Sequence, residues 1–143
     1  MIAGMANSMH ALKCLLPTLL LFCFLDYLWL GNVGKYLYID HLGPLLLLKG
    51  STITPRLLPA LIVYVLFAIM QWWIVLPLAQ YQISQSFIYG ALIGLVVYGV
   101  YDMTNLAVIK DWTMLIAMVD WCWGIFLCSS TAGFCAFLYQ YFK

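Results

Sequence analysis

Three aspartates interrupt otherwise apolar segments of this chain: Asp26, Asp102 and Asp120. A carboxylate in the hydrocarbon core of a membrane costs about 2.5–3.5 kcal/mol on insertion scales, so such residues normally face a protein interior or a water-filled cavity. Carboxyl groups held together raise one another's affinity for protons, because like charges repel. A cluster of this kind can carry a proton or bind a ligand. These side chains are therefore the first candidates for a binding site.

The spacing of small and polar residues indicates which helix faces carry these aspartates. Residues three and four apart share one face of a helix, and two such stripes flank Lys110: Gly90, Gly94, Tyr98, Asp102 and Asn105 before it, and Thr113, Ala117, Asp120, Gly124, Cys128 and Thr131 after it. The Gly90/Gly94 pair is a GxxxG pattern, which lets a neighbouring helix approach closely. Facing stripes would bring Asp102, Asn105 and Asp120 together.

A shared polar site predicts the effect of replacing Asp102. Asparagine keeps the hydrogen-bonding capacity of the carboxyl group, whereas leucine leaves its expected partners unsatisfied at about 1–3 kcal/mol. We therefore expect asparagine to be tolerated better. Helix-to-helix hydrogen bonding alone would also place polar residues here, and the sequence leaves this structural alternative open.

The composition is that of an integral membrane protein. Of 143 residues, 66% are hydrophobic and 8% are charged, whereas a soluble domain is about 25% charged. The net charge of +1 is too small to indicate nucleic-acid binding. At this length we expect a single domain over residues 1–143, in contact with the lipid bilayer.

Four apolar segments are each long enough to cross a membrane, which takes about 20 residues: 12–30, 59–78, 84–109 and 112–139. They predict an all-α polytopic protein, a four-helix antiparallel transmembrane bundle. Residues 31–58 form a long loop with aromatic, charged and leucine residues, typical of an interfacial segment. At 1.5 Å per residue, the three aspartates fall about 6–12 Å inside the membrane on the side of this loop.

The placement of the basic residues predicts the orientation in the membrane, and the remaining polar residues narrow the classes of site that the chain could contain. Lys35, Lys49, Arg56 and Lys110 lie on the side of the long loop, against Lys13 and Lys143 on the other, which favours a cytoplasmic loop. His10 is expected in a polar tail. The five cysteines lack metal-ligand spacing, and hydrolase and nucleotide-binding motifs are absent. We predict no catalytic residue, no metal site and no cofactor.

Several motifs together resemble a known family. They are similar to domain of unknown function 2177, a family of small bacterial membrane proteins. The matching segments are Leu25-Asp-Tyr-Leu-Trp-Leu-Gly31, Tyr98-Gly-Val-Tyr-Asp-Met-Thr-Asn-Leu-Ala107 and Val119-Asp-Trp-Cys-Trp-Gly124, together with Tyr38 and Leu42-Gly43. The resemblance covers most of the chain and departs at Pro44, where many members have histidine. It implies a four-span protein of the bacterial inner membrane, with signature positions Asp26, Trp29, Asp102, Thr104, Asn105, Asp120 and Trp123. It implies no activity.

Three functions follow as hypotheses. In the first, Asp26, Tyr98, Asp102, Asn105 and Asp120 line a pocket that binds or translocates a small ligand, ion or proton. In the second, the chain is a non-catalytic accessory subunit of a larger membrane complex; homo-oligomers are also open. A lipid-modifying enzyme with carboxyl acid–base groups is the least favoured, because no nucleophile or metal motif accompanies them.

Overall fold

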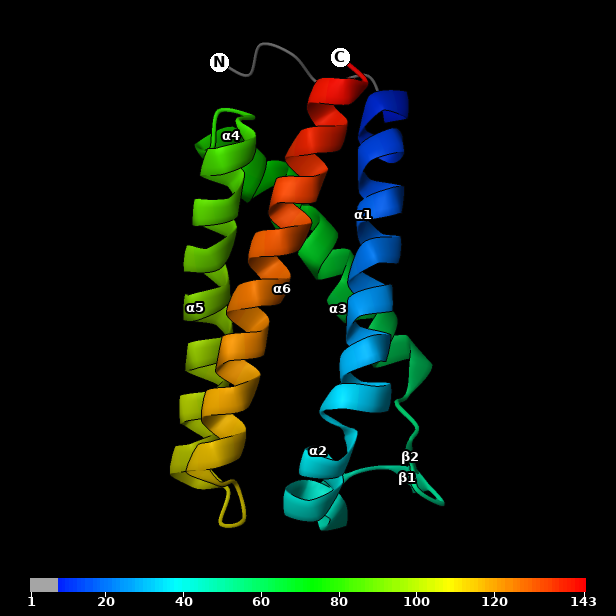
Figure 1. Cartoon of the computed structure of the whole chain (residues 1–143), viewed down its shortest axis with the longest axis vertical. Helices are drawn as coiled ribbons and strands as arrows, with labels where there is room; N and C mark the ends of the chain where they lie inside the picture. Colours follow the sequence, from blue (N-terminus) through cyan, green and yellow to red (C-terminus); the bar gives the residue numbers. More distant parts are fainter. Residues whose placement is uncertain (1–7) are drawn as a thin grey trace.

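The computed structural model describes residues 8–143, which form four long apolar helical spans (Figure 1). The first is α1 (Ser8–Leu28), continued by the π-helical turn η1 (Trp29–Val33). The second comprises α3 (Leu57–Met70), the π-helical turn η3 (Gln71–Val75) and α4 (Leu76–Leu78). The third and fourth are α5 (Ile83–Val108) and α6 (Met114–Tyr141). Each is long and apolar enough to cross a membrane, which confirms the predicted all-α, four-span protein.

The first helix begins earlier than the apolar pattern predicts. His10 lies in the first turns of α1, and its ring stacks on Tyr139 at 4.7 Å between centroids. Trp72 meets the same imidazole edge-on at 6.2 Å. The expectation of a polar tail at His10 is therefore wrong, because aromatic packing against α6 and η3 extends the helix beyond its apolar core.

The segment between the first two spans contains regular structure. It folds into helix α2 (Lys35–Leu42), a 3-10 turn η2 (Gly43–Leu45) and an antiparallel hairpin of β1 (Leu48–Lys49) and β2 (Thr52–Ile53). Gly50 in the hairpin turn has φ of 63°, a conformation that glycine adopts at no steric cost. Tyr38 and Leu42 of α2 pack on Ile116 of α6. This contact folds α2 back onto one end of the bundle.

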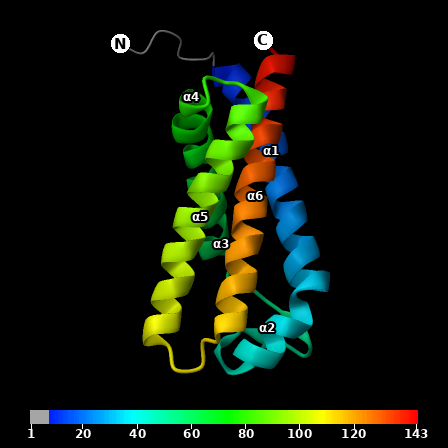
Figure 2. The ribbon, with the colours of Figure 1, turned by 60° about the vertical axis from the view of Figure 1, so that its left-hand side comes forward.

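Helices α5 and α6 form the most closely packed pair and lie side by side in both views (Figures 1 and 2). Glycines make the close approach possible. A Cβ on Gly90 or Gly94 would lie 2.6 Å from a backbone oxygen of α6, that of Cys128 or Gly124 respectively. Helix α1 packs on the other side of α6, while α3 has no buried residue. The outward faces are apolar, as expected of helices in contact with lipid.

Candidate functional site

The three aspartates lie near helix ends that meet at one end of the bundle. Asp26 is two residues before the end of α1, Asp102 six before the end of α5, and Asp120 six after the start of α6. At 1.5 Å per residue, these positions are about 3–9 Å inside the helix ends. The same end carries α2 and the β-hairpin (Figure 1). Local sequence thus sets the depth of each carboxyl group, and helix packing sets which groups meet.

Two Asp-x-x-Trp pairs join α1 to α6 in a crossed arrangement. Trp29 follows Asp26 by three residues, and Trp123 follows Asp120 by three, so each pair shares a helix face. The indole rings stack with centroids 4.5 Å apart and planes 4° from parallel. The Nε1–H of Trp123 donates to Asp26 Oδ1 at 3.3 Å. Each tryptophan therefore donates its hydrogen bond to a polar group of another element, not to the aspartate three residues before it.

Tyr38 of α2 completes the network. Its hydroxyl donates to Oδ1 of Asp120 and accepts from Nε1–H of Trp29 at 3.2 Å. Gly34 makes room for both rings, since a Cβ there would be 2.9 Å from the Tyr38 ring and 3.2 Å from the indole of Trp29. Burial, reinforced by the negative charge of Asp120, raises the pKa of Tyr38. The phenol therefore keeps its proton and remains a donor to the carboxyl group.

Asp102 is the exception in this cluster. Its side chain is 0% exposed, and neither carboxyl oxygen has a hydrogen-bond partner among the described residues. The charge of Asp120 acts on both Asp102 and Asp26. No lysine, arginine or histidine of the described chain forms a hydrogen bond with any of these three carboxyl groups. Buried polar groups are nearly always hydrogen-bonded, so Asp102 is the carboxyl group of this cluster with both oxygens available to accept from a donor outside the described residues.

The other two predicted site residues differ from each other. Tyr98 is half-buried, its ring covers Gly124, and the charges of Asp26 and Asp120 act on its hydroxyl. Asn105 lies nearly one turn beyond Asp102 and forms none of the hydrogen bonds that link Tyr38, Trp29, Trp123 and the aspartates. The structure thus places the ring of Tyr98 one helical turn from Asp120, and its role in a site stays a prediction. A role for Asn105 stays a prediction.

The site predicted from sequence did not include Tyr38, Trp29 or Trp123, although the family resemblance had marked Trp29 and Trp123 as signature positions. Their positions within the aspartate motifs were the available signal. No set of three or more His, Cys, Asp or Glu side chains between residues 8 and 143 is arranged to hold a metal ion. The arrangement instead offers carboxyl acceptors beside aromatic donors, which suits a proton or an organic group that donates hydrogen bonds.

The Tyr38 contact gives a first testable prediction. Tyr38→Phe should lower the free energy of unfolding by about 1 kcal/mol, because Asp120 and the Trp29 indole each lose a partner in a part-buried place. Tyr36→Phe is the matched control, since Tyr36 is 69% exposed on the same helix. Thermal unfolding in detergent followed by tryptophan fluorescence measures both. Equal melting temperatures for the two variants would contradict the contact.

Comparison with known proteins identifies a family. The family described as "Predicted membrane protein (DUF2177)" matches residues 11–137, which include all the residues of the aspartate cluster. No curated protein and no solved structure matches the chain.

Proposed function

Since this chain belongs to the DUF2177 family of predicted membrane proteins, which names no activity, we propose that it is a binding protein whose aspartate cluster takes up a small cationic group within the membrane. Asp26, Asp102 and Asp120 supply the acceptors, and Tyr38 and Trp123 hold two of them in place. The observation that supports this proposal most directly is that Asp102 is completely buried and neither of its carboxyl oxygens has a hydrogen-bond partner among the described residues.

The physical argument is charge balance. Three carboxyl groups lie in an apolar protein, and no basic side chain between residues 8 and 143 forms a hydrogen bond with them. Isolated carboxylates in such surroundings are strongly unfavourable and become neutralised. Neutralisation comes from bound protons or from a bound cation. The absence of a metal-ligand arrangement among residues 8–143 favours a proton or an ammonium group over a divalent metal.

Binding is favoured over translocation. The next buried polar pair along α6 is Gln71–Thr131, where Gln71 Nε2 donates to Thr131 Oγ1 at 2.8 Å. Between Asp120 and Thr131 the interior is filled by Leu127 and Cys128, both 0% exposed. A proton path needs a chain of polar groups or water, and these side chains interrupt it. We place the site in the cytoplasmic half of a bacterial inner membrane, from the lysine and arginine distribution.

Thermal unfolding with added ethylammonium tests this function. A ligand that binds the folded state stabilises it by mass action, and each kcal/mol shifts the melting temperature of a chain this size by about 2–4 °C. We expect ethylammonium chloride to raise the melting temperature at neutral pH beyond matched sodium chloride. The gain should shrink as pH falls, because protons compete for the same carboxyl groups.

The variants make the experiment specific. Asp120→Asn should abolish the response to ethylammonium, and Asp111→Asn, at an exposed aspartate of the α5–α6 loop, should retain it. Wild type and Asp120→Asn responding identically to ethylammonium and to pH would overturn the proposed function.

An accessory role in a larger membrane complex is the second candidate, and one observation favours it. Helix α3 has no fully buried residue, so the part of its surface that does not pack on Phe22 of α1 is available to lipid or to another chain. A stoichiometric partner covering α3 in protein isolated from its native membrane would support this alternative.

A further inference from the structure

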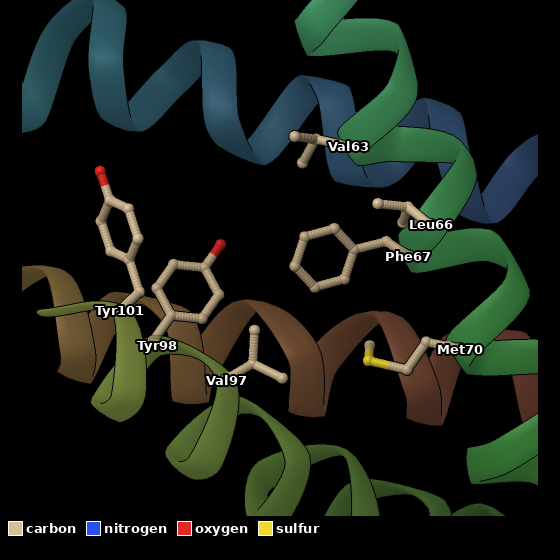
Figure 3. Close-up of a pocket in the computed structure, with 7 residues that line it drawn as sticks. All are labelled: Val63, Leu66, Phe67, Met70, Val97, Tyr98 and Tyr101. Atoms are coloured by element: carbon tan, nitrogen blue, oxygen red, sulfur yellow. The ribbon is translucent and has the colours of Figure 1, made fainter. Parts of the chain in front are cut away.

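An apolar groove of about 420 Å³ opens beside the aspartate cluster (Figure 3). This volume is within the usual range for small-molecule sites, about 300–1,000 Å³. The groove lies between α3 and α5, and its lining is Val63, Leu66, Phe67, Met70, Val97, Tyr98 and Tyr101. Leu66 and Val97 at its rim are 58% and 45% exposed. The groove therefore opens sideways, towards the surrounding lipid.

The course of α3 creates this groove. At the π-helical turn the second span is held against α6, where Gln71, 1% exposed, donates to Thr131. From there α3 crosses behind α6 towards α1 and leaves the side of α5 (Figure 1). The side chains of α3 and α5 then face each other across a gap (Figure 3). The sequence keeps both walls apolar, so the gap suits hydrocarbon.

The groove has an apolar end and a polar end. Met70 lies at one end, and at the other the hydroxyl groups of Tyr98 and Tyr101 point away from α5 (Figure 3). The ring of Tyr98 also covers Gly124 of α6, which is one helical turn from Asp120. Asp102 follows Tyr101 directly on α5. The polar end of the groove therefore lies one residue along α5 from Asp102, which does not itself line the groove.

We propose that this groove holds an acyl chain of an aminophospholipid of the surrounding bilayer, whose primary ammonium group is taken up by the aspartate cluster. The inference rests on the proposed function and names the ligand class of that site. An ammonium group offers three N–H donors and no acceptor, and Asp102 offers two oxygens without partners. The acyl chain would run from the end of the groove at Tyr98 and Tyr101 towards Met70, away from the membrane surface.

The charges around this end fit such a lipid. Lys35 starts α2, Lys49 ends β1, Arg56 precedes α3, and Lys110 lies in the α5–α6 loop, all in connecting segments at the end of the bundle that holds the aspartates. Arg56 is seven residues before Val63, about 10 Å along the chain of α3. Asp40 of α2 and Asp111 of the α5–α6 loop are exposed at the same end, so four basic and two acidic side chains leave the rim with a net positive charge. A net positive rim with an acidic interior complements a headgroup that carries both a phosphate and an ammonium group. A purely anionic lipid would meet the carboxyl groups unfavourably.

Native mass spectrometry of the full chain in detergent tests the proposal. Phosphatidylethanolamine, phosphatidylcholine and phosphatidylglycerol with identical acyl chains are added separately, and the bound fraction is titrated. We expect phosphatidylethanolamine to bind about tenfold more tightly than the other two, the size expected for charge-assisted hydrogen bonds. Equal affinities, or a preference for either other lipid, would overturn the assignment of the ammonium group.

Neighbouring positions provide matched variants for the groove. Val97→Trp and Leu66→Trp fill it, whereas Val96→Trp and Val65→Trp place the same side chain on exposed lipid-facing positions outside it. Each filling variant should bind phosphatidylethanolamine at least about fivefold more weakly than its neighbour. If the groove-filling variant and its neighbour bind phosphatidylethanolamine equally in both pairs, the groove is not the binding site of the acyl chain.

The ethylammonium response separates this inference from the proposed function. Filling variants should keep the melting-temperature rise with ethylammonium, because the carboxyl groups remain in place. Asp102→Asn should lose the preference among headgroups while still binding lipid. If wild type responds to ethylammonium but shows no preference among the lipids, the assignment of an aminophospholipid is overturned and the proposed function stands. If wild type does not respond to ethylammonium, the proposed function is overturned.

Discussion

Gly94→Ala is expected to lower the free energy of unfolding by about 1–3 kcal/mol, the usual cost of overpacking. The added Cβ would lie 2.6 Å from the carbonyl oxygen of Gly124 and 2.9 Å from the Cα of Ile125. Both atoms belong to the backbone of α6, so no side-chain rotation relieves the clash and the helices must separate. Gly94→Leu should cost more. Denaturant or thermal unfolding in detergent, followed by circular dichroism, measures the series.

Gly43→Ala is the matched control, because nothing lies within 4 Å of a Cβ at Gly43 and its backbone is right-handed helical. Its effect should stay within about 0.5 kcal/mol, or stabilise slightly through a less flexible unfolded chain. The separation of α5 from α6 should also disturb the aspartate site, since Asp102 and Asp120 lie on these two helices. Unfolding at the same temperature in Gly94→Ala and Gly43→Ala would refute the close packing.

Asp102→Leu is expected to raise stability by about 1–3 kcal/mol in lipid-free detergent, the cost of burying a polar group without a partner. This reverses the expectation from sequence that asparagine would be tolerated better than leucine. That expectation assumed partners on neighbouring helices, and the structure shows none for either oxygen of Asp102. Leucine has a similar size and leaves no donor unsatisfied, whereas asparagine keeps an unpartnered amide.

The expected order of melting temperatures is therefore leucine above wild type, with asparagine at or below wild type. Asp111→Leu at the exposed loop aspartate controls for loss of charge and should change stability by less than about 0.5 kcal/mol. Asp102→Leu should at the same time lose the response to ethylammonium, a trade of function for stability. A leucine variant less stable than asparagine would show that Asp102 has a hydrogen-bonding partner in the fold.

The spans followed from the sequence because their signal is local. Segment length and apolar composition predicted four membrane-crossing helices; the family match confirms a membrane protein, and the described residues contain four helices long and apolar enough to cross a membrane. The positions of the aspartates near helix ends also followed, because a helix has a constant rise per residue; their depth in a membrane stays a prediction. The start of α1 could not be predicted from the local sequence. His10 belongs to this helix and packs on the rings of Trp72 and Tyr139, which are more than sixty positions away.

The sequence by itself determined that this is a four-span membrane protein with three carboxyl groups near one end of the bundle. Only the tertiary structure decided what each carboxyl group meets. Tyr38 reaches Asp120 across 82 residues, and Trp123 reaches Asp26 across 97. Asp102 is left without a partner, and the departure of α3 from α5 opens the groove. These outcomes depend on helix rotation, crossing and the fold-back of α2, which are set by long-range packing rather than by local periodicity.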